Sequence, residues 1–108
     1  FYSDIMGMRY MAGEPGRSLF YRAGQSVFLL FYAPETLKGG KLPAHGATGP
    51  SHTCFVVPPD EYERWKAYLP EQGVPIIQEV QWDAATSFYF HDPDGNVLEI
   101  ANRDIWPT

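Results

Sequence analysis

Hydrophobic and polar residues alternate in short segments along most of this chain, and a period of two is typical of β-strands. Ten glycines and ten prolines in 108 residues separate these segments. In the first part of the chain, three segments rich in aromatic and branched residues lie between glycine-containing turns: residues 8–16, 18–24 and 26–34. The pattern predicts three strands joined as an antiparallel meander, because the connections are short.

A stretch without periodicity divides the chain. Residues 34–50 collect glycine, proline and threonine, a composition typical of a connecting segment. Alternation resumes over residues 51–57 and predicts another strand. We therefore expect a linker over residues 35–50 between two halves.

The second half contains the longest predicted helix. Asp60 stands where an N-cap is expected, and Glu63 completes a capping-box pattern. Gly73 is a typical helix stop. Three apolar residues have the spacing of one buried helical stripe: Tyr62, Trp65 and Leu69. Three more strands are predicted after the helix: residues 74–82, 85–92 and 95–103.

The two halves share an internal repeat. Gly7 aligns with Gly73, and two pairs of segments align after them: residues 18–21 with 87–90, and 27–30 with 97–100. The second half is predicted to be a βαβββ module. The first half shows a helix stub over Phe1–Met6 and three strands, so it lacks the leading strand, and we expect the chain to be a fragment. The expected fold is α+β, one domain over 1–108 with an incomplete first module at 1–34 and a second module at 51–104.

Charge and composition exclude several classes of function. The net charge is −5, and no basic stripe is present to attract a nucleic acid backbone. No apolar run is long enough for a membrane span. The single cysteine, Cys54, cannot form an internal disulfide, which agrees with the cytoplasmic location that we expect.

The turn sequence Asp92–Gly95 sets the alignment of the last two strands. Aspartate, proline and glycine at these positions predict a type I turn with a glycine bulge, which places Asp92 opposite Asn96. Continuing that register places Tyr89 opposite Glu99. One face of the hairpin would then carry Ser87, Tyr89, His91 and Glu99, and His52 can join it from the strand at 51–57. The other face would pack on the helix through Phe88, Phe90, Leu98 and Ile100.

Several segments resemble the vicinal oxygen chelate superfamily, which includes glyoxalase I, extradiol dioxygenases, fosfomycin-modifying thiol transferases and bleomycin-resistance proteins. They are FYSDIMGM, HGATGPSH and, most specifically, SFYFHDPDGNVLEIAN. The resemblance implies paired βαβββ modules whose curved mixed sheet encloses a divalent metal. By position, it assigns His52 and Glu99 as ligands and places a third, a histidine, on a first strand upstream of Phe1. Manganese, iron, cobalt, nickel and zinc suit such donors.

From these residues we expect a metal-dependent enzyme acting on a small oxygen-rich substrate. Glu99 and Tyr89 are the expected catalytic residues, and Ser87 and Tyr89 would orient the substrate. Aromatic side chains of the other module would wall the pocket: Phe28, Tyr32 and Phe20. The last strand of the first half carries Phe28–Phe31 where glyoxalase I has a further carboxylate ligand, so a dioxygenase or thiol transferase is favoured. A homodimer is also expected.

Other interpretations remain open. His52 could be a hydrogen-bonded strand histidine, Glu99 a solvent-facing carboxylate, and Tyr89 a sheet aromatic. We interpret His45 and His91 as surface residues and Cys54 as a small wall residue. An alternative function is that of a bleomycin-resistance-like dimer which sequesters a cationic or aromatic ligand, since the charge and the aromatic content of 16% suit cation stacking.

Overall fold

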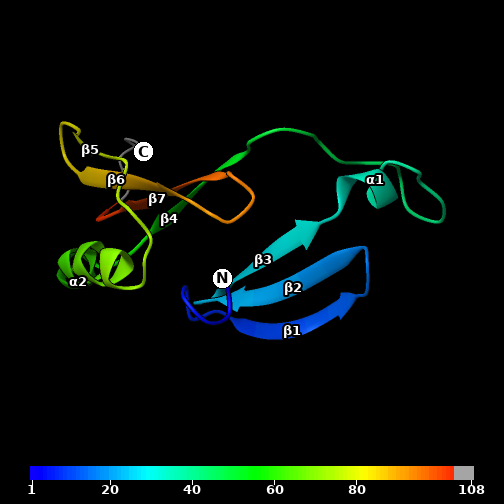
Figure 1. Ribbon diagram of the computed structural model, residues 1–108, viewed down its shortest axis with the longest axis horizontal. Helices are drawn as coiled ribbons and strands as arrows, with labels where there is room; N and C mark the ends of the chain where they lie inside the picture. Colours follow the sequence, from blue (N-terminus) through cyan, green and yellow to red (C-terminus); the bar gives the residue numbers. More distant parts are fainter. Residues whose placement is uncertain (104–108) are drawn as a thin grey trace. The chain divides into compact units, whose positions relative to one another are not determined.

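The computed structural model describes residues 1–103, which form two compact units (Figure 1). The first spans Phe1–Gly49 and the second begins at Pro50. The predicted end of the second module, residue 104, lies outside the described residues.

The first unit is built on an antiparallel meander, as predicted. Its sheet has the order β1-β2-β3, with strands β1 (Arg9–Glu14), β2 (Ser18–Ala23) and β3 (Ser26–Phe31). A bulge interrupts the β1–β2 register between Tyr10 and Ala12. Next to it, a Cβ atom on Gly13 would approach the Ser18 carbonyl oxygen to 2.5 Å, so only glycine fits this close approach.

Two short segments of the first unit differ from the prediction. Phe1–Met6 forms turns, in which the Phe1 carbonyl accepts bonds from the Ile5 and Met6 amides at 2.9 and 3.0 Å. Gly7 follows with a φ of +73°, which ends the segment after these turns, so the predicted helix stub is wrong. Conversely, a short helix α1 (Ala33–Thr36) opens the predicted linker. Its proline suits the first helical turn, but four residues are too few to show periodicity.

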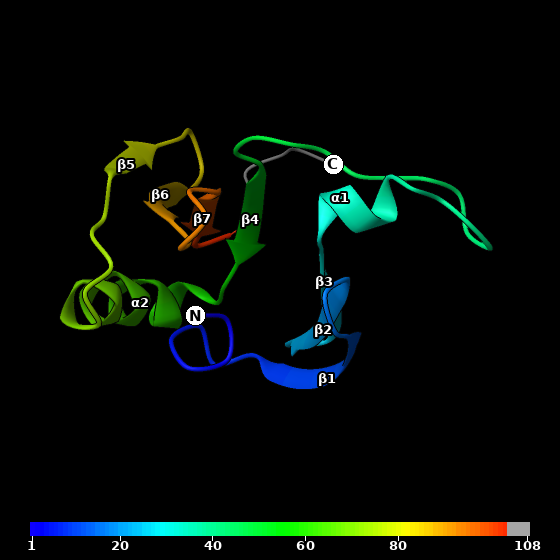
Figure 2. The same cartoon turned by 45° about the vertical axis from the view of Figure 1, so that its right-hand side comes forward.

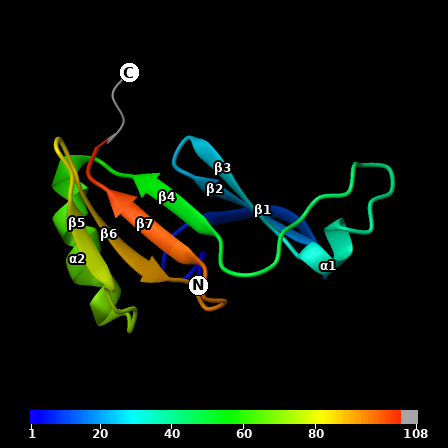
Figure 3. The same cartoon turned by 90° about the horizontal axis from the view of Figure 1, so that it is seen from above.

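The second unit contains a four-stranded mixed sheet of order β4-β7-β6-β5. Its strands are β4 (His52–Val56), β5 (Gln78–Gln81), β6 (Thr86–His91) and β7 (Val97–Ala101). Strands β4 and β7 are parallel, and the other pairs are antiparallel; Figure 3 shows β4 and β7 running side by side in one direction. Strand β5 is shorter than the predicted 74–82. Pro75 has no amide hydrogen for a ladder bond, although the Ile77 amide still donates to the Tyr89 carbonyl at 2.8 Å.

Helix α2 (Pro59–Glu71) begins earlier than predicted. Pro58 is its N-cap, and no side chain caps the first turn, so the predicted capping by Asp60 and Glu63 is wrong. Proline lacks an amide hydrogen and has a helical φ, which allows the helix to start at Pro59. Asp60 therefore lies in the first turn, where its carboxylate is 3.8 Å from the Arg64 guanidinium.

The end of α2 is as predicted. Gly73 adopts a φ of +81°. Its amide donates to the Pro70 carbonyl at 3.0 Å, and the Val74 amide donates to the Leu69 carbonyl at 2.9 Å. These two bonds form a Schellman motif, which satisfies the last carbonyls of the helix.

The helix covers one face of the four-stranded sheet (Figure 2). Tyr62 and Leu69 are buried, and the Tyr62 ring lies 5.3 Å from the Phe88 ring. Four sheet residues on this face are at most 1% exposed: Phe88, Phe90, Leu98 and Ile100. The sheet side of the predicted core is confirmed, whereas Trp65 of the predicted helical stripe is only partly buried. The opposite face of β6 and β7 is left for polar side chains. Within residues 1–103, no helix combines the length and apolar character needed to cross a membrane.

Candidate functional site

The hairpin between β6 and β7 is held by the side chain of Asp92. One carboxylate oxygen accepts hydrogen bonds from the Asp94 amide at 3.0 Å and the Asn96 amide at 2.8 Å, and the other accepts from the Asn96 side chain at 2.8 Å. Gly95 has a φ of +84°. The register that follows pairs Tyr89 with Glu99 and Ser87 with Ala101, so this part of the prediction is confirmed.

Asn96 also connects the hairpin to β4. Its side-chain oxygen accepts from the Ser51 amide at 3.0 Å and from the Ser51 hydroxyl at 3.1 Å. The parallel register then places Cys54 beside Glu99 and His52 beside Val97. The sequence contained the asparagine within the DPDGN turn, but nothing in the turn pattern indicated a contact 45 residues away.

His52 and Glu99 meet on the face opposite the helix. The His52 Nε2 atom lies 3.0 Å from Glu99 Oε1. The Glu99 side chain is 4% exposed and the His52 side chain 52%. The second carboxylate oxygen, Glu99 Oε2, is buried and has no hydrogen-bond partner within the described part of the chain. A buried, unpartnered carboxylate oxygen is costly, so this site has unused capacity to bind a donor or a cation.

Tyr89 borders this pair. Its ring centroid lies 5.9 Å from that of His52. Burial is the main cause that raises the pKa of the Tyr89 hydroxyl, and the Glu99 carboxylate raises it further, while a hydrogen bond with Ser87 acts in the opposite direction. The hydroxyl therefore stays protonated and can donate a hydrogen bond at neutral pH.

Cys54 lies on the same face. Although the residue is exposed, desolvation of the thiol raises its pKa to about 11, with a further contribution from Glu99. The protonated thiol is a poor nucleophile, which agrees with its interpretation as a wall residue.

A tryptophan that the sequence prediction missed also reaches this face. The Trp82 indole nitrogen donates to the Ser87 hydroxyl oxygen at 2.9 Å, and Ser87 is fully buried. The predicted strand over 74–82 contained Trp82 as its last residue, but the pattern gave no indication of where its side chain would lie.

The remaining candidate residues belong to other parts of the chain or to the end of β6. Phe28, Tyr32 and Phe20 belong to the first unit. The Phe28 ring is 5.1 Å from that of Tyr2, and Tyr32 is the exposed N-cap of α1. His91 is exposed at the end of β6, and the His45 ring contacts the Phe31 ring at 4.7 Å. The proposed wall function of the first three stays a prediction.

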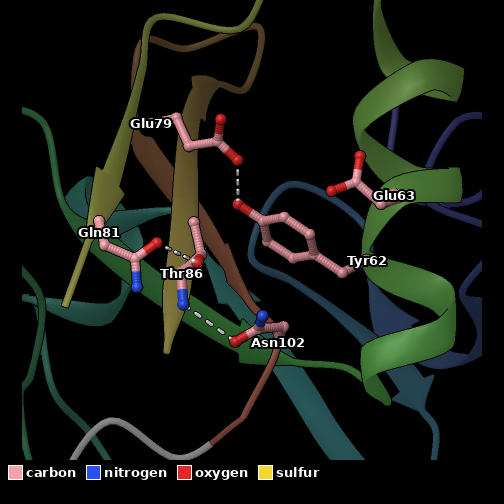
Figure 4. A pocket seen from close by; sticks show the side chains of 6 residues that line it. All are labelled: Tyr62, Glu63, Glu79, Gln81, Thr86 and Asn102. Atoms are coloured by element: carbon pink, nitrogen blue, oxygen red, sulfur yellow. Dashed lines mark hydrogen bonds between the residues drawn. The ribbon is translucent and has the colours of Figure 1, made fainter. Parts of the chain in front are cut away.

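A hollow of about 390 Å³ lies on the helix side of the sheet (Figure 4). The Tyr62 hydroxyl reaches from α2 across it and donates to Glu79 at 2.7 Å. The Thr86 hydroxyl donates to Gln81 at 2.9 Å, and the Thr86 amide to the Asn102 side chain at 3.0 Å. These polar groups are bonded within the protein, so we interpret this hollow as structural.

The sequence model of the Glyoxalase/Bleomycin resistance protein/Dioxygenase superfamily matches residues 1–100 of this chain. The chain belongs to this superfamily. The α+β fold with curved sheets, predicted from the internal repeat and the resemblance, is therefore confirmed.

Two relatives show the range of activities within the superfamily. A biphenyl-2,3-diol 1,2-dioxygenase from Rhodococcus globerulus is 27% identical over 106 residues, covering 92% of this chain and 52% of the dioxygenase. The chain thus spans about half the length of that curated relative. The crystal structure of a lactoylglutathione lyase from Agrobacterium tumefaciens has a TM-score of 0.91 and 29% identity, covering 100% of this chain and 84% of the other.

A more distant structure shares the fold alone. The fosfomycin resistance protein FosX from Listeria monocytogenes, solved as a mutant with Mn(II) and a dihydroxypropylphosphonic acid, has a TM-score of 0.67 and 15% identity, covering 97% of this chain and 78% of the other. Residues 1–103 of this chain contain no group of three or more histidine, cysteine, aspartate or glutamate side chains placed to hold a metal. On this face, the pair His52 and Glu99 offers adjacent donors of the right chemistry.

Proposed function

We propose that this chain is part of a divalent-metal-dependent enzyme of the superfamily, with His52 and Glu99 as two of the metal ligands. The supporting observation is their 3.0 Å separation beside a buried carboxylate oxygen without a partner. Ligands about 2.1 Å from one ion and at about a right angle to each other would be about 3.0 Å apart. The pair therefore has the spacing of adjacent ligands.

The unpartnered oxygen favours this interpretation over a structural hydrogen bond. A His52–Glu99 hydrogen bond alone accounts for Oε1 but leaves Oε2 buried and unsatisfied. A cation beside the carboxylate would compensate its desolvation. We propose that the third donor comes from outside the described residues, on a first strand that precedes Phe1 in the full-length protein.

Each residue of the site has a proposed task. A bound divalent ion would act as a Lewis acid that stabilises negative charge on a substrate oxygen. Glu99 and His52 would hold it, and Glu99 would also place a negative charge beside the reacting groups. The protonated Tyr89 hydroxyl would donate to a substrate oxygen and fix its orientation. Ser87 would hold the neighbouring Trp82 side chain in place, since its hydroxyl oxygen accepts the hydrogen bond from the indole.

We favour a dioxygenase or thiol transferase over a glyoxalase. The internal repeat aligns Leu29 of β3 with Glu99 of β7, so the first unit offers no carboxylate at the equivalent position. The curated relative acts on biphenyl-2,3-diol by its name, and a vicinal diol is an oxygen-rich ligand of the expected kind.

A second candidate function is sequestration of a ligand without catalysis. The absence of a three-donor group within residues 1–103 favours it, as does the acidic, aromatic-rich composition.

In either case we propose that the protein works as a homodimer. Light scattering at micromolar concentration would test this, and a monomer would contradict it.

Calorimetric titration of the full-length protein with Mn(II), Co(II) and Zn(II) separates the two functions. The enzyme proposal predicts binding that weakens at least 10-fold in His52→Ala and in Glu99→Ala. Glu79→Gln, which changes a glutamate on the helix side of the same sheet, is the matched control and should bind like wild type. Equal binding by all variants, or no binding by wild type, would leave sequestration as the better account.

A further inference from the structure

Trp82 lies over the same face of the sheet as His52 and Glu99. Its indole nitrogen donates to Ser87 at 2.9 Å. Because side chains alternate along β6, Ser87 shares its face with Tyr89, which pairs with Glu99. The indole is therefore bonded to the residue that lies one same-face step, about 7 Å, along β6 from the tyrosine that borders the proposed metal site.

The indole is held rigidly. The Trp82 amide donates to the Ala85 carbonyl at 2.8 Å, which closes the turn between β5 and β6. The Gln81 side chain donates to the carbonyls of Trp82 and Ala85 at 2.9 and 3.2 Å. With its backbone and its ring nitrogen both bonded, the side chain loses little entropy when a ligand contacts it.

The tryptophan nevertheless keeps open surface. It is 39% exposed, although its nitrogen is bonded to a fully buried hydroxyl. The indole nitrogen is satisfied within the protein, so what the ring still offers to a ligand is apolar surface. A rigid, partly exposed aromatic ring beside polar groups is suited to stack on a planar part of a ligand.

We propose that Trp82 is a specificity-determining residue that stacks on a planar, unsaturated group of the substrate while the oxygen donors of that substrate lie at His52 and Glu99. This inference rests on the proposed function and adds the substrate class: a molecule with two oxygen donors at one end and a planar apolar group at the other. Ser87 is a positioning residue for the indole.

A matched pair of ligands tests the inference. 2,3-Dihydroxybiphenyl and 3-cyclohexylcatechol carry the same diol, but the second ring is planar only in the first compound. Their binding to the full-length protein with Mn(II) is measured by calorimetry for wild type, Trp82→Leu and Trp82→Phe. Trp65→Leu, on helix α2 at the other face, is the control. Phenylalanine keeps an aromatic ring, so it also covers the case in which leucine prevents folding.

The expected result is a selective loss. Trp82→Leu should weaken binding of 2,3-dihydroxybiphenyl about 3- to 10-fold more than binding of 3-cyclohexylcatechol, since ring stacking contributes beyond buried area. Trp82→Phe should retain much of the preference, and Trp65→Leu all of it. Equal losses for both ligands, or no loss, would overturn the inference. The proposed function would still stand in that case if diol binding depends on Glu99.

Failure of the proposed function gives a different result. If wild type binds Mn(II) through His52 and Glu99 but neither diol, the metal site stands and the substrate inference is overturned. If wild type binds no metal, the proposed function fails and the inference fails with it. Trp82 fluorescence in a Trp65→Phe, Trp106→Phe background gives a second readout. A stacked planar ring should quench this fluorescence, and adding Ser87→Ala to the same background should reduce the quenching, because the indole then loses its positioning bond.

Discussion

His52 Nε2 and Glu99 Oε1 lie 3.0 Å apart although the two residues are 47 positions apart in the sequence. The parallel pairing of β4 with β7 produces this proximity, since it brings the first residue of β4 beside the strand that carries the glutamate. The glutamate side chain is buried, whereas the histidine side chain is half exposed. One partner is thus fixed in the sheet, and the other remains accessible to an incoming ligand.

Alkylation of the single cysteine tests the electrostatics of this face. Burial and, after it, Glu99 raise the pKa of the Cys54 thiol from 9.0 to about 11. At pH 8, iodoacetamide should therefore modify wild type about 100-fold more slowly than a free cysteine. Glu99→Gln should react severalfold faster, because one cause of the raised pKa is removed while burial remains. Glu63→Gln is the control; equal rates in all three proteins would refute the predicted influence of Glu99.

Removing the Asp92 side chain should destabilise the hairpin that aligns Tyr89 with Glu99. Asp92→Ala deletes three hydrogen bonds to a 6% exposed carboxylate, so we expect a loss of about 2 kcal/mol in the free energy of unfolding. Asp94→Ala, at the exposed tip of the same turn, should cost less than about 0.5 kcal/mol. Urea denaturation measures both, and equal effects would contradict the capping function of Asp92.

The contact between α2 and β5 should make stability depend on acid. The hydrogen bond from Tyr62, and then that from Lys66, lowers the pKa of Glu79 below its ordinary 4.5. A lowered pKa adds stability that is fully present above about pH 4.5 and is lost as the pH falls through the folded-state value. Tyr62→Phe should therefore cost about 1 kcal/mol at pH 7 and less at pH 3.

Denaturation of wild type and Tyr62→Phe at both pH values checks this sign. Glu63→Gln removes an exposed carboxylate that pairs with Lys66 at 3.2 Å but not with Tyr62, and it should change stability by less than about 0.5 kcal/mol. A cost of Tyr62→Phe that is larger in acid than at neutral pH would show that the hydrogen bond does not favour the ionised carboxylate.

Local turn chemistry made part of the site predictable. Asp92, Pro93 and Gly95 determine a turn type, the turn determines the register, and alternation then places Tyr89 and Glu99 on one face. The helix stop at Gly73 follows from similar local rules. The start of α2 was not predictable from capping preferences, because consecutive prolines at 58 and 59 allowed an earlier start.

Contacts between distant segments were not predictable in this way. The bond from Trp82 to Ser87 depends on how a turn directs a side chain, and that of Ser51 to Asn96 depends on two strands meeting 45 residues apart. Alternation placed His52 on a face of its own strand, but the pairing of that strand with β7 followed only from the superfamily resemblance. Sequence periodicity describes each element and not its partners.

The central claim is that Glu99 binds a divalent ion together with His52 and does not merely hydrogen-bond to it. Glu99→Gln keeps the shape and an oxygen that can accept from His52, but it removes the negative charge that a cation requires. The most direct measurement is titration of the full-length protein with Co(II), followed by visible absorption, for wild type, Glu99→Gln and the control Glu79→Gln. The account predicts saturable Co(II) bands of equal strength in wild type and Glu79→Gln, and at least 10-fold weaker binding in Glu99→Gln. Equally strong bands in Glu99→Gln, or none in wild type, would contradict it.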